Sequence, residues 1–179
     1  MTEENPVYIN IYSSPLGKMI LSSDGKYLTG LRFEGKKFFE QEVRQQQEIE
    51  KALPVFDEAF SWLNIYFSGK APDFTPPLLF DKSSSTEFRK DVWEILLTIP
   101  FGKTMSYGQI AQRLTEEYKS NPARKSIKTM SAQAVGQAAR HNPILLIVPC
   151  HRVVGADGSV TGYAGEVERK IWLLNHEEK

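Results

Sequence analysis

The sequence predicts an α+β fold made of two small domains. Apolar and polar residues alternate over residues 7–33, as in strands, whereas apolar residues recur at helical spacing in the second half. Two segments rich in Pro and Ser, Thr75–Pro77 and Lys82–Ser85, separate these patterns and are typical of a linker. We therefore expect an N-terminal α/β domain over residues 1–81 and a C-terminal domain over residues 82–179.

The N-terminal domain is expected to begin with a β-meander. Turn signals at Ser14–Gly17 and Asp24–Gly25 divide residues 7–33 into three strands. Residues 37–68 then show apolar side chains at helical spacing, which predicts one or two helices that end before Gly69.

The C-terminal domain shows two helix starts of the capping-box type. Ser84 with Glu87, and Ser106 with Gln109, place a hydroxyl three residues before a side chain that can reach back to the backbone N–H of the capping residue. The first helix would end before Pro100, and the second would be short, ending near Leu114 in the sequence.

A third helix is expected over residues 131–140, followed by a strand. Helix, connector, helix and strand follow one another as in a winged helix-turn-helix. The connector, Thr115–Met130, is far longer than the usual tight turn of this motif. It is also basic, with Lys119, Arg124, Lys125 and Lys128.

Cys150 is the only cysteine, and its neighbours suggest two different roles. The apolar run Ile144–Val148 predicts a short buried strand that would hold the thiol in a fixed place. His151 and Arg152 follow directly, and either could favour a nucleophilic thiolate. A buried structural cysteine fits the same residues, so these residues alone leave both roles open.

Composition excludes several classes of protein. Hydrophobic residues make up 41% of the chain, enough for a core, and no apolar run is long enough to cross a membrane. The acidic N-terminus lacks a signal-peptide pattern. A single cysteine cannot form an internal disulfide and indicates a reducing cytoplasm. No Cys and His cluster has metal-ligand spacing, so we expect no metal.

A net charge of zero hides an uneven distribution. Residues 1–81 carry 8 basic and 12 acidic side chains, whereas residues 103–152 carry 8 basic and 2 acidic ones. The local excess suggests a basic, nucleic-acid-binding face in the second half, although a solvated surface explains the same charges.

Six motifs of the second half occur in the order of one known family. They are Ile99–Gly102, Ser106–Ala111, Ala134–Gly136, Asn142–Gly155, Thr161–Gly165 and Lys170–Glu177. Together they resemble the O6-alkylguanine-DNA alkyltransferases, also called methylated-DNA–protein-cysteine methyltransferases. The resemblance runs from Phe88 to Glu177, about half of the chain, and the N-terminal half matches only loosely.

The resemblance implies a fold, an activity and a partner. A domain similar to ribonuclease H would precede the winged-helix domain. The activity would be direct reversal of DNA damage: an alkyl group leaves O6 of guanine, or O4 of thymine, and remains on Cys150 after a single turnover. The partner would be double-stranded DNA that contains alkylated guanine, with the damaged base flipped out of the stack. The reaction would need no cofactor, and the protein would act as a monomer.

The spacing of residues around Glu177 indicates that its carboxylate has a partner, independently of the resemblance. Lys170, Leu173, Leu174 and Glu177 share one helical face. A carboxylate on a largely apolar face needs a partner. By resemblance this partner is His151, which would take the thiol proton through a water.

The resemblance also implies the remaining site residues. Asn142 would brace the turn that holds the cysteine, and the Tyr107 hydroxyl would point at the flipped guanine and donate a proton. The expected substrate contacts are Tyr107, Val153, Tyr163, Ala164 and Lys170. The expected DNA contacts are Ser131, Ala132, Gln133, Gly136, Arg140 and Arg152.

Three positions depart from the family pattern or stay open. Gln133 stands where many relatives place an arginine that fills the gap left by the flipped base. Glu166 replaces a glycine that the family often has. Arg152 fits a structural role as well as a phosphate contact.

Three other functions remain open at this point. An alkyltransferase-like protein would bind alkylguanine without repairing it, but such relatives lack the cysteine. A cysteine hydrolase would use Cys150, His151 and Glu177 and would show turnover. A winged-helix transcription factor would tolerate the loss of Cys150.

Overall fold

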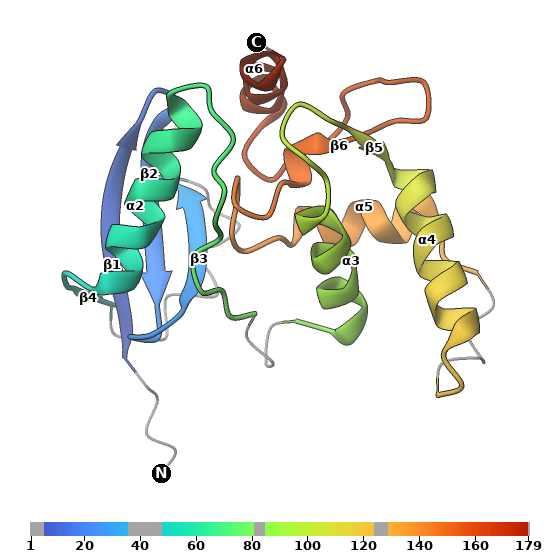
Figure 1. The fold of residues 1–179 in the computed structure, drawn as a ribbon, viewed down its shortest axis with the longest axis horizontal. Coiled ribbons are helices and arrows are strands. Elements are labelled where there is room, and N and C mark those ends of the chain that lie inside the picture. Colours follow the sequence, from blue (N-terminus) through green and yellow to red (C-terminus); the bar gives the residue numbers. More distant parts are fainter. Residues whose placement is uncertain (1–5, 36–47, 81–84, 124–128, 179) are drawn as a thin grey trace. The chain divides into compact units, whose positions relative to one another are not determined.

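The computed structural model describes residues 6–35, 48–80, 85–123 and 129–178. The chain divides into two compact units (Figure 1). The first is Met1–Asp81 with Pro143–Leu145, and the second is Lys82–Asn142 with Leu146–Lys179. The contribution of Pro143–Leu145 to the first unit was not predicted from the sequence.

The first unit contains the predicted meander. Strands β1 (Val7–Ser14), β2 (Gly17–Ser23) and β3 (Leu28–Phe33) pair antiparallel in chain order. A short strand, β4 (Glu48–Glu50), pairs parallel to β1, so the sheet order is β3-β2-β1-β4. The alternation of apolar residues puts one face into the core, and the meander is confirmed.

Helix α2 (Pro54–Phe67) packs on this sheet (Figure 1). It begins with proline in the first turn, where the missing N–H costs nothing, and Phe56, Leu63 and Tyr66 are fully buried. The predicted helix over the later part of residues 37–68 is confirmed, and residues 36–47 lie outside the described ranges.

The predicted strand over Ile144–Val148 is wrong. The run forms isolated bridges instead, and one of them joins Ile144 to Leu31 through hydrogen bonds of the Leu31 backbone at the edge of β3. The chain then turns at Leu146, whose φ is 68°. The whole run is buried as expected, but its backbone satisfies the sheet edge for only one residue pair before the turn.

In the second unit, helix α3 (Glu87–Leu97) begins two residues later than its predicted cap. Its N-cap is Thr86, whose hydroxyl accepts from the backbone N–H of Arg89. Ser84 lies outside the described residues. The Thr86 hydroxyl stands three residues before the Arg89 N–H, as N-capping requires. The helix ends before Pro100, as predicted.

Helix α4 (Tyr107–Ser120) has the predicted capping box of Ser106 and Gln109, but its predicted end near Leu114 is wrong. The helix continues because Tyr118 extends its buried face one turn beyond Leu114. The connector to the next helix is correspondingly shorter. Lys119 lies in the last turn of α4, and Arg124, Lys125 and Lys128 fall outside the described residues.

The predicted third helix is confirmed as α5 (Ala132–Arg140), with Ser131 as N-cap. The 3₁₀ turn η1 (Cys150–Arg152) follows, then strand β6 (Val153–Val154), which pairs parallel with β5 (Met105–Ser106). Helix α6 (Val167–Glu177) closes the unit. The arrangement of α3, α4, α5 and the strand pair confirms the winged helix-turn-helix (Figure 1).

Two negative findings concern the described ranges. None of their helices is long and apolar enough to cross a bilayer. No three of their His, Cys, Asp and Glu side chains lie close enough to hold a metal ion together.

Candidate active site

Cys150 is held by its own turn and by Asn142, a fully buried side chain just after α5. The Cys150 backbone N–H donates to the Val148 carbonyl at 2.9 Å. Asn142 Nδ2 donates to the same carbonyl at 2.8 Å and contacts Cys150 Sγ at 3.2 Å. Asn142 thus ties the turn to the sulfur itself, which fixes the direction of the thiol.

Burial raises the pKa of the Cys150 thiol to about 11, against the opposing effects of the Asn142 hydrogen bond and the Lys170 charge. Cys150 is 4% exposed. The resting side chain is therefore a thiol at neutral pH, and a nucleophilic role requires a base that removes its proton.

His151 and Glu177 form the candidate base. His151 Nε2 lies 2.6 Å from Glu177 Oε1, and both side chains are buried. An ionised carboxylate can only accept, so Nε2 carries the proton and Nδ1 is the basic nitrogen. Sequence separation of 26 residues is bridged because α6 brings its last turn against η1.

The two side chains differ in charge. Burial raises the pKa of Glu177, but the hydrogen bonds and charges of His151 and Arg152 outweigh it and hold the pKa well below its ordinary value. Burial lowers the pKa of His151, with the charges of Arg152 and Lys170, against the effect of Glu177. Glu177 is therefore ionised and His151 neutral near pH 7.

Arg152 bonds to Glu177 rather than facing outward. Its Nε and Nη2 donate to Oε2 and Oε1 of Glu177 at 2.8 and 3.0 Å, and its Nη1 donates to the Ile99 carbonyl at 2.7 Å. The residue is 7% exposed. Of the two roles left open by the sequence, these contacts favour the structural one over the DNA contact that we expected.

Gly102 is a site residue that sequence reasoning missed. Its backbone N–H donates to Glu177 Oε2 at 3.0 Å, and its φ is 71°. A Cβ there would stand 2.9 Å from the Glu177 carbonyl oxygen. The position therefore needs glycine, both for its conformation and for the close approach of α6. The turn signal Pro100–Gly102 was visible in the sequence, but its partner was not.

The pairing of β5 with β6 brings the start of α4 to the cysteine turn. The Tyr107 hydroxyl donates to the Thr161 carbonyl at 3.1 Å, and Lys170 Nζ lies 3.4 Å from the same hydroxyl. Burial raises the pKa of Tyr107, partly offset by the Thr161 bond. Tyr107 therefore keeps its proton at neutral pH and can serve as a donor.

Lys170 is completely buried on α6, and its ammonium holds the loop before that helix. It donates to the carbonyls of Thr161 at 3.0 Å, Gly162 at 3.2 Å and Val153. Burial lowers the pKa of Lys170 to about 8. Through these bonds Lys170 holds the loop at Thr161 and Gly162 in place, and the Val153 carbonyl accepts one of them. We expected Lys170 and Val153 to contact the substrate, and in this structure they bond to each other.

A small pocket opens at the sulfur. Its lining comes from α4, α5, η1 and the loop: Tyr107, Gly136, Ala139, Arg140, Cys150, Gly162, Tyr163 and Ala164. Its free volume is about 10 Å³, room for about one water. The pocket as it stands is too small to hold a purine base.

Most of the expected DNA contacts gather on α5. Ser131, Ala132, Gln133 and Arg140 are exposed. A hollow of about 260 Å³ runs beside them, lined by Tyr107, Ala132, Gln133, Gly136, Gln137, Arg140, Thr161 and Gly162. It shares Tyr107, Gly136, Arg140 and Gly162 with the sulfur pocket, so the helix surface leads to Cys150. Gln137 was not predicted.

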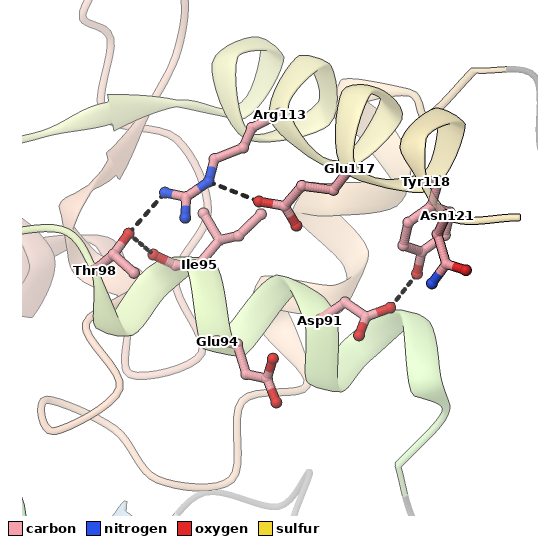
Figure 2. Close-up of a pocket in the computed structure, with 8 residues that line it drawn as sticks. All are labelled: Asp91, Glu94, Ile95, Thr98, Arg113, Glu117, Tyr118 and Asn121. Atoms are coloured by element: carbon pink, nitrogen blue, oxygen red, sulfur yellow. Dashed lines mark hydrogen bonds and ion pairs between the residues drawn. The ribbon is translucent and has the colours of Figure 1, made fainter. Parts of the chain in front are cut away.

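A second hollow, of about 360 Å³, lies between α3 and α4 and shares no lining residue with the sulfur pocket (Figure 2). Five of its polar side chains bond to one another. Arg113 joins Glu117 and Thr98, and Tyr118 bonds to Asp91. Arg113 and Arg152 are thus already paired with carboxylates, and the expected basic face is weaker than the residue count suggests.

Glu166 adopts a backbone conformation that favours glycine. Its φ is 81° at the N-cap of α6, and its carboxylate pairs with Arg169 at 3.1 Å. Arg169 also donates to the Gly165 carbonyl. Arg169 therefore holds the end of the loop at Gly165 and Glu166, where the family often has glycine at the second position.

Comparison with known proteins identifies the family over both units. The model described as 6-O-methylguanine DNA methyltransferase, ribonuclease-like domain, matches residues 7–80. The model described as 6-O-methylguanine DNA methyltransferase, DNA binding domain, matches residues 87–179.

Individual relatives of the same family match nearly the whole chain. The methylated-DNA–protein-cysteine methyltransferases of Mycobacterium leprae and Methanosarcina acetivorans are each 38% identical over 172 residues, covering 96% of this chain and 93% and 98% of theirs. The crystal structure of Mycobacterium tuberculosis O6-methylguanine methyltransferase is 38% identical, with TM-score 0.78, 96% of this chain and 93% of that one covered. The Mycobacterium tuberculosis OGT complex with DNA is 37% identical, with TM-score 0.76 and coverage of 96% and 92%. This chain therefore belongs to the methylated-DNA–protein-cysteine methyltransferase family.

Proposed function

We propose that this protein repairs DNA by moving an alkyl group from O6 of guanine in double-stranded DNA to the sulfur of Cys150. The observation that carries the proposal is the placement of one buried thiol. Cys150 lies at a pocket beside α5, is bonded by Asn142, and directly precedes the His151–Glu177 pair. O4-methylthymine presents a similar alkyl ether and is a second expected substrate.

The proposed reaction is a displacement at the alkyl carbon. The Cys150 proton passes to Nδ1 of His151, through a water, and the resulting thiolate attacks the carbon in line with its bond to O6. A carbon–sulfur bond forms and the carbon–oxygen bond breaks, with its electron pair left on guanine. Guanine takes a proton from Tyr107, whose phenolate regains one from water, and His151 releases the thiol proton to water. The proton lost by the thiol thus balances the one gained by the base. No cofactor enters this scheme.

The product explains why the protein would act once. A thioether has no leaving group that water can displace under mild conditions, so the alkyl group stays on Cys150. The reaction then consumes one protein molecule for each repaired base. A free thiol is required, which supports action in a reducing cytoplasm.

The slim face of α5 supports binding in the minor groove. Ala132 and Gly136 add little bulk, and Gln133 is exposed next to the hollow that leads to the pocket. We propose that Gln133 fills part of the space left by the flipped base, while the loop at 162–164 opens to admit it. Ser131 and Arg140 flank this face and would contact the phosphate backbone of the DNA. A single chain supplies every group in this scheme, so we expect a monomer.

A repair titration tests the proposal. Increasing amounts of duplex DNA with one O6-methylguanine are added to a fixed amount of protein, and restored guanine is measured. Repair should stop at one guanine per protein molecule, and Cys150→Ala should repair none. Continued turnover would indicate a hydrolase, and binding without repair by the unchanged protein would indicate an alkylguanine-binding module.

A further inference from the structure

The carboxylate of Glu177 is saturated by donors from two other segments of its unit. Each oxygen accepts two hydrogen bonds: Oε1 from His151 and Arg152, and Oε2 from Arg152 and the Gly102 backbone. Half of these bonds come from Arg152, in the planar fork that a guanidinium offers to a carboxylate. The plane of the carboxylate, and with it the direction of its bond to His151, is therefore fixed mainly by Arg152.

The charge of Arg152 acts inside the site. Besides Glu177, the guanidinium bonds to the Ile99 carbonyl and stands 5.8 Å from the centre of the Phe101 ring. Both of these partners belong to the turn that also carries Gly102. Arg152 thus joins that turn to α6 and η1 and places a positive charge next to a buried negative one.

The charge balance matters because His151 has to accept a proton. A buried carboxylate on its own favours the imidazolium form of a neighbouring histidine. An imidazolium has no basic nitrogen left, so it cannot take the proton of a thiol. We propose that Arg152 is a positioning residue of the alkyl transfer, which orients Glu177 and balances its charge so that His151 stays neutral and able to accept the Cys150 proton. This inference rests on the proposed function.

The other charged or titratable groups around His151 do not replace Arg152. In the described part of the chain these groups are Cys150 on η1, Lys170 on α6 and Tyr163, whose ring meets His151 edge-on at 6.5 Å. Lys170 gives its hydrogen bonds to Val153, Thr161, Gly162 and Tyr107. Burial lowers the pKa of His151, Glu177 raises it, and Arg152 lowers it again, in agreement with the proposed balance.

Three variants of the full-length protein test the proposal. Arg152→Gln removes the charge, and Arg152→Lys keeps the charge but loses the fork. Arg113→Gln is the matched control, because it removes a half-exposed arginine that pairs with Glu117 outside the site. Two quantities are measured across pH: the protonation of His151 by nitrogen NMR, and the single-turnover rate of alkyl transfer from a free O6-alkylguanine base. The His151 signal is the one that His151→Gln removes.

Arg152→Gln should raise the midpoint of His151 protonation, and the acid limb of the rate profile, by about one pH unit or more. Arg152→Lys should leave the midpoint near its original value while it slows transfer at every pH, and Arg113→Gln should change neither quantity. A midpoint that does not move in Arg152→Gln, or that moves equally in Arg152→Lys, would overturn the proposal.

One measurement can overturn the proposal even if Arg152→Gln does not fold. In the unchanged protein His151 should be neutral at pH 7, with its proton on Nε2, and an imidazolium there would also overturn the proposal. Failure of the proposed function looks different. The unchanged protein would then transfer no alkyl group, while the NMR titrations would still report on Arg152.

Discussion

Replacing Glu177 with glutamine should separate the chemistry of the site from its binding of DNA. The substitution keeps the shape of the side chain but turns one oxygen into an NH₂ group. Each carboxylate oxygen accepts two hydrogen bonds, so either orientation of the amide brings two donors against the new NH₂. The change also leaves the buried Arg152 without its counter-charge.

The expected losses of stability and of transfer rate follow from these contacts. Breaking a buried ion pair by removing one partner costs about 3–5 kcal/mol of folding stability. For a protein of this size, that corresponds to a fall in Tm of roughly 6–20 °C. The rate of alkyl transfer should fall by a factor of roughly 10²–10⁴, because His151 loses the partner that fixes its tautomer. DNA affinity should change little, since Glu177 is 5% exposed.

The neighbouring residue offers a matched control. Glu178 is exposed at the C-cap of α6, so Glu178→Gln should leave stability and transfer unchanged. The assay compares single-turnover transfer from methylated duplex DNA with DNA affinity, both at a temperature where each variant is folded. If transfer and affinity fall by the same factor in Glu177→Gln, the residue only supports the fold, and Glu177 does not assist His151 as the general base.

Three further predictions concern pH, the flipped base and salt. The pKa values of both Glu177 and His151 are lowered in the folded protein. Their contributions to stability are therefore complete above the pKa values of the unfolded chain, about 4.3 and 6.5, and are lost as pH falls through the folded values. Tm should drop on acidification, and less steeply in Glu177→Gln. Gln133→Ala should slow repair of duplex DNA but hardly change reaction with a free O6-alkylguanine base, whereas Gln133→Arg should match or exceed the parent on duplex; equal slowing on both substrates by alanine would contradict the wedge role. DNA affinity should fall with salt with a small slope, because Arg113 and Arg152 are already paired with carboxylates, and an affinity independent of salt would exclude phosphate contacts.

The elements that the sequence predicted correctly are those set by local chemistry. Alternation of apolar residues defined the meander, and the side chains of Ser106, Gln109 and Ser131 marked the starts of α4 and α5. Such signals depend on neighbours within one turn or one strand, so tertiary structure had little opportunity to override them.

The errors arose where distant contacts decide the conformation. The run Ile144–Val148 is apolar enough to be buried in any form, and only its pairing with Leu31 and the turn at Leu146 determine its path. The end of α4 is a different case. Tyr118 lies one turn beyond Leu114 on the same buried face, so the local apolar spacing already indicated the longer helix.

The candidate site was predictable in part. The spacing of Lys170, Leu173 and Glu177 showed a carboxylate that needed a partner, but spacing could not identify His151 as that partner. The inward turn of Arg152 and the close approach of Gly102 depend on how α6 packs against η1 and the turn after α3. No feature within a few residues of either one encodes that packing.

The central claim, that Cys150 is the alkyl acceptor, is tested most directly by mass spectrometry. The protein is incubated with excess duplex DNA that contains O6-methylguanine, its intact mass is measured, and the modified peptide is sequenced. The account predicts the gain of one methyl group, located on the sulfur of Cys150, and no gain in Cys150→Ser. An unchanged mass after the DNA has been repaired, or a methyl group on any other residue, would contradict it.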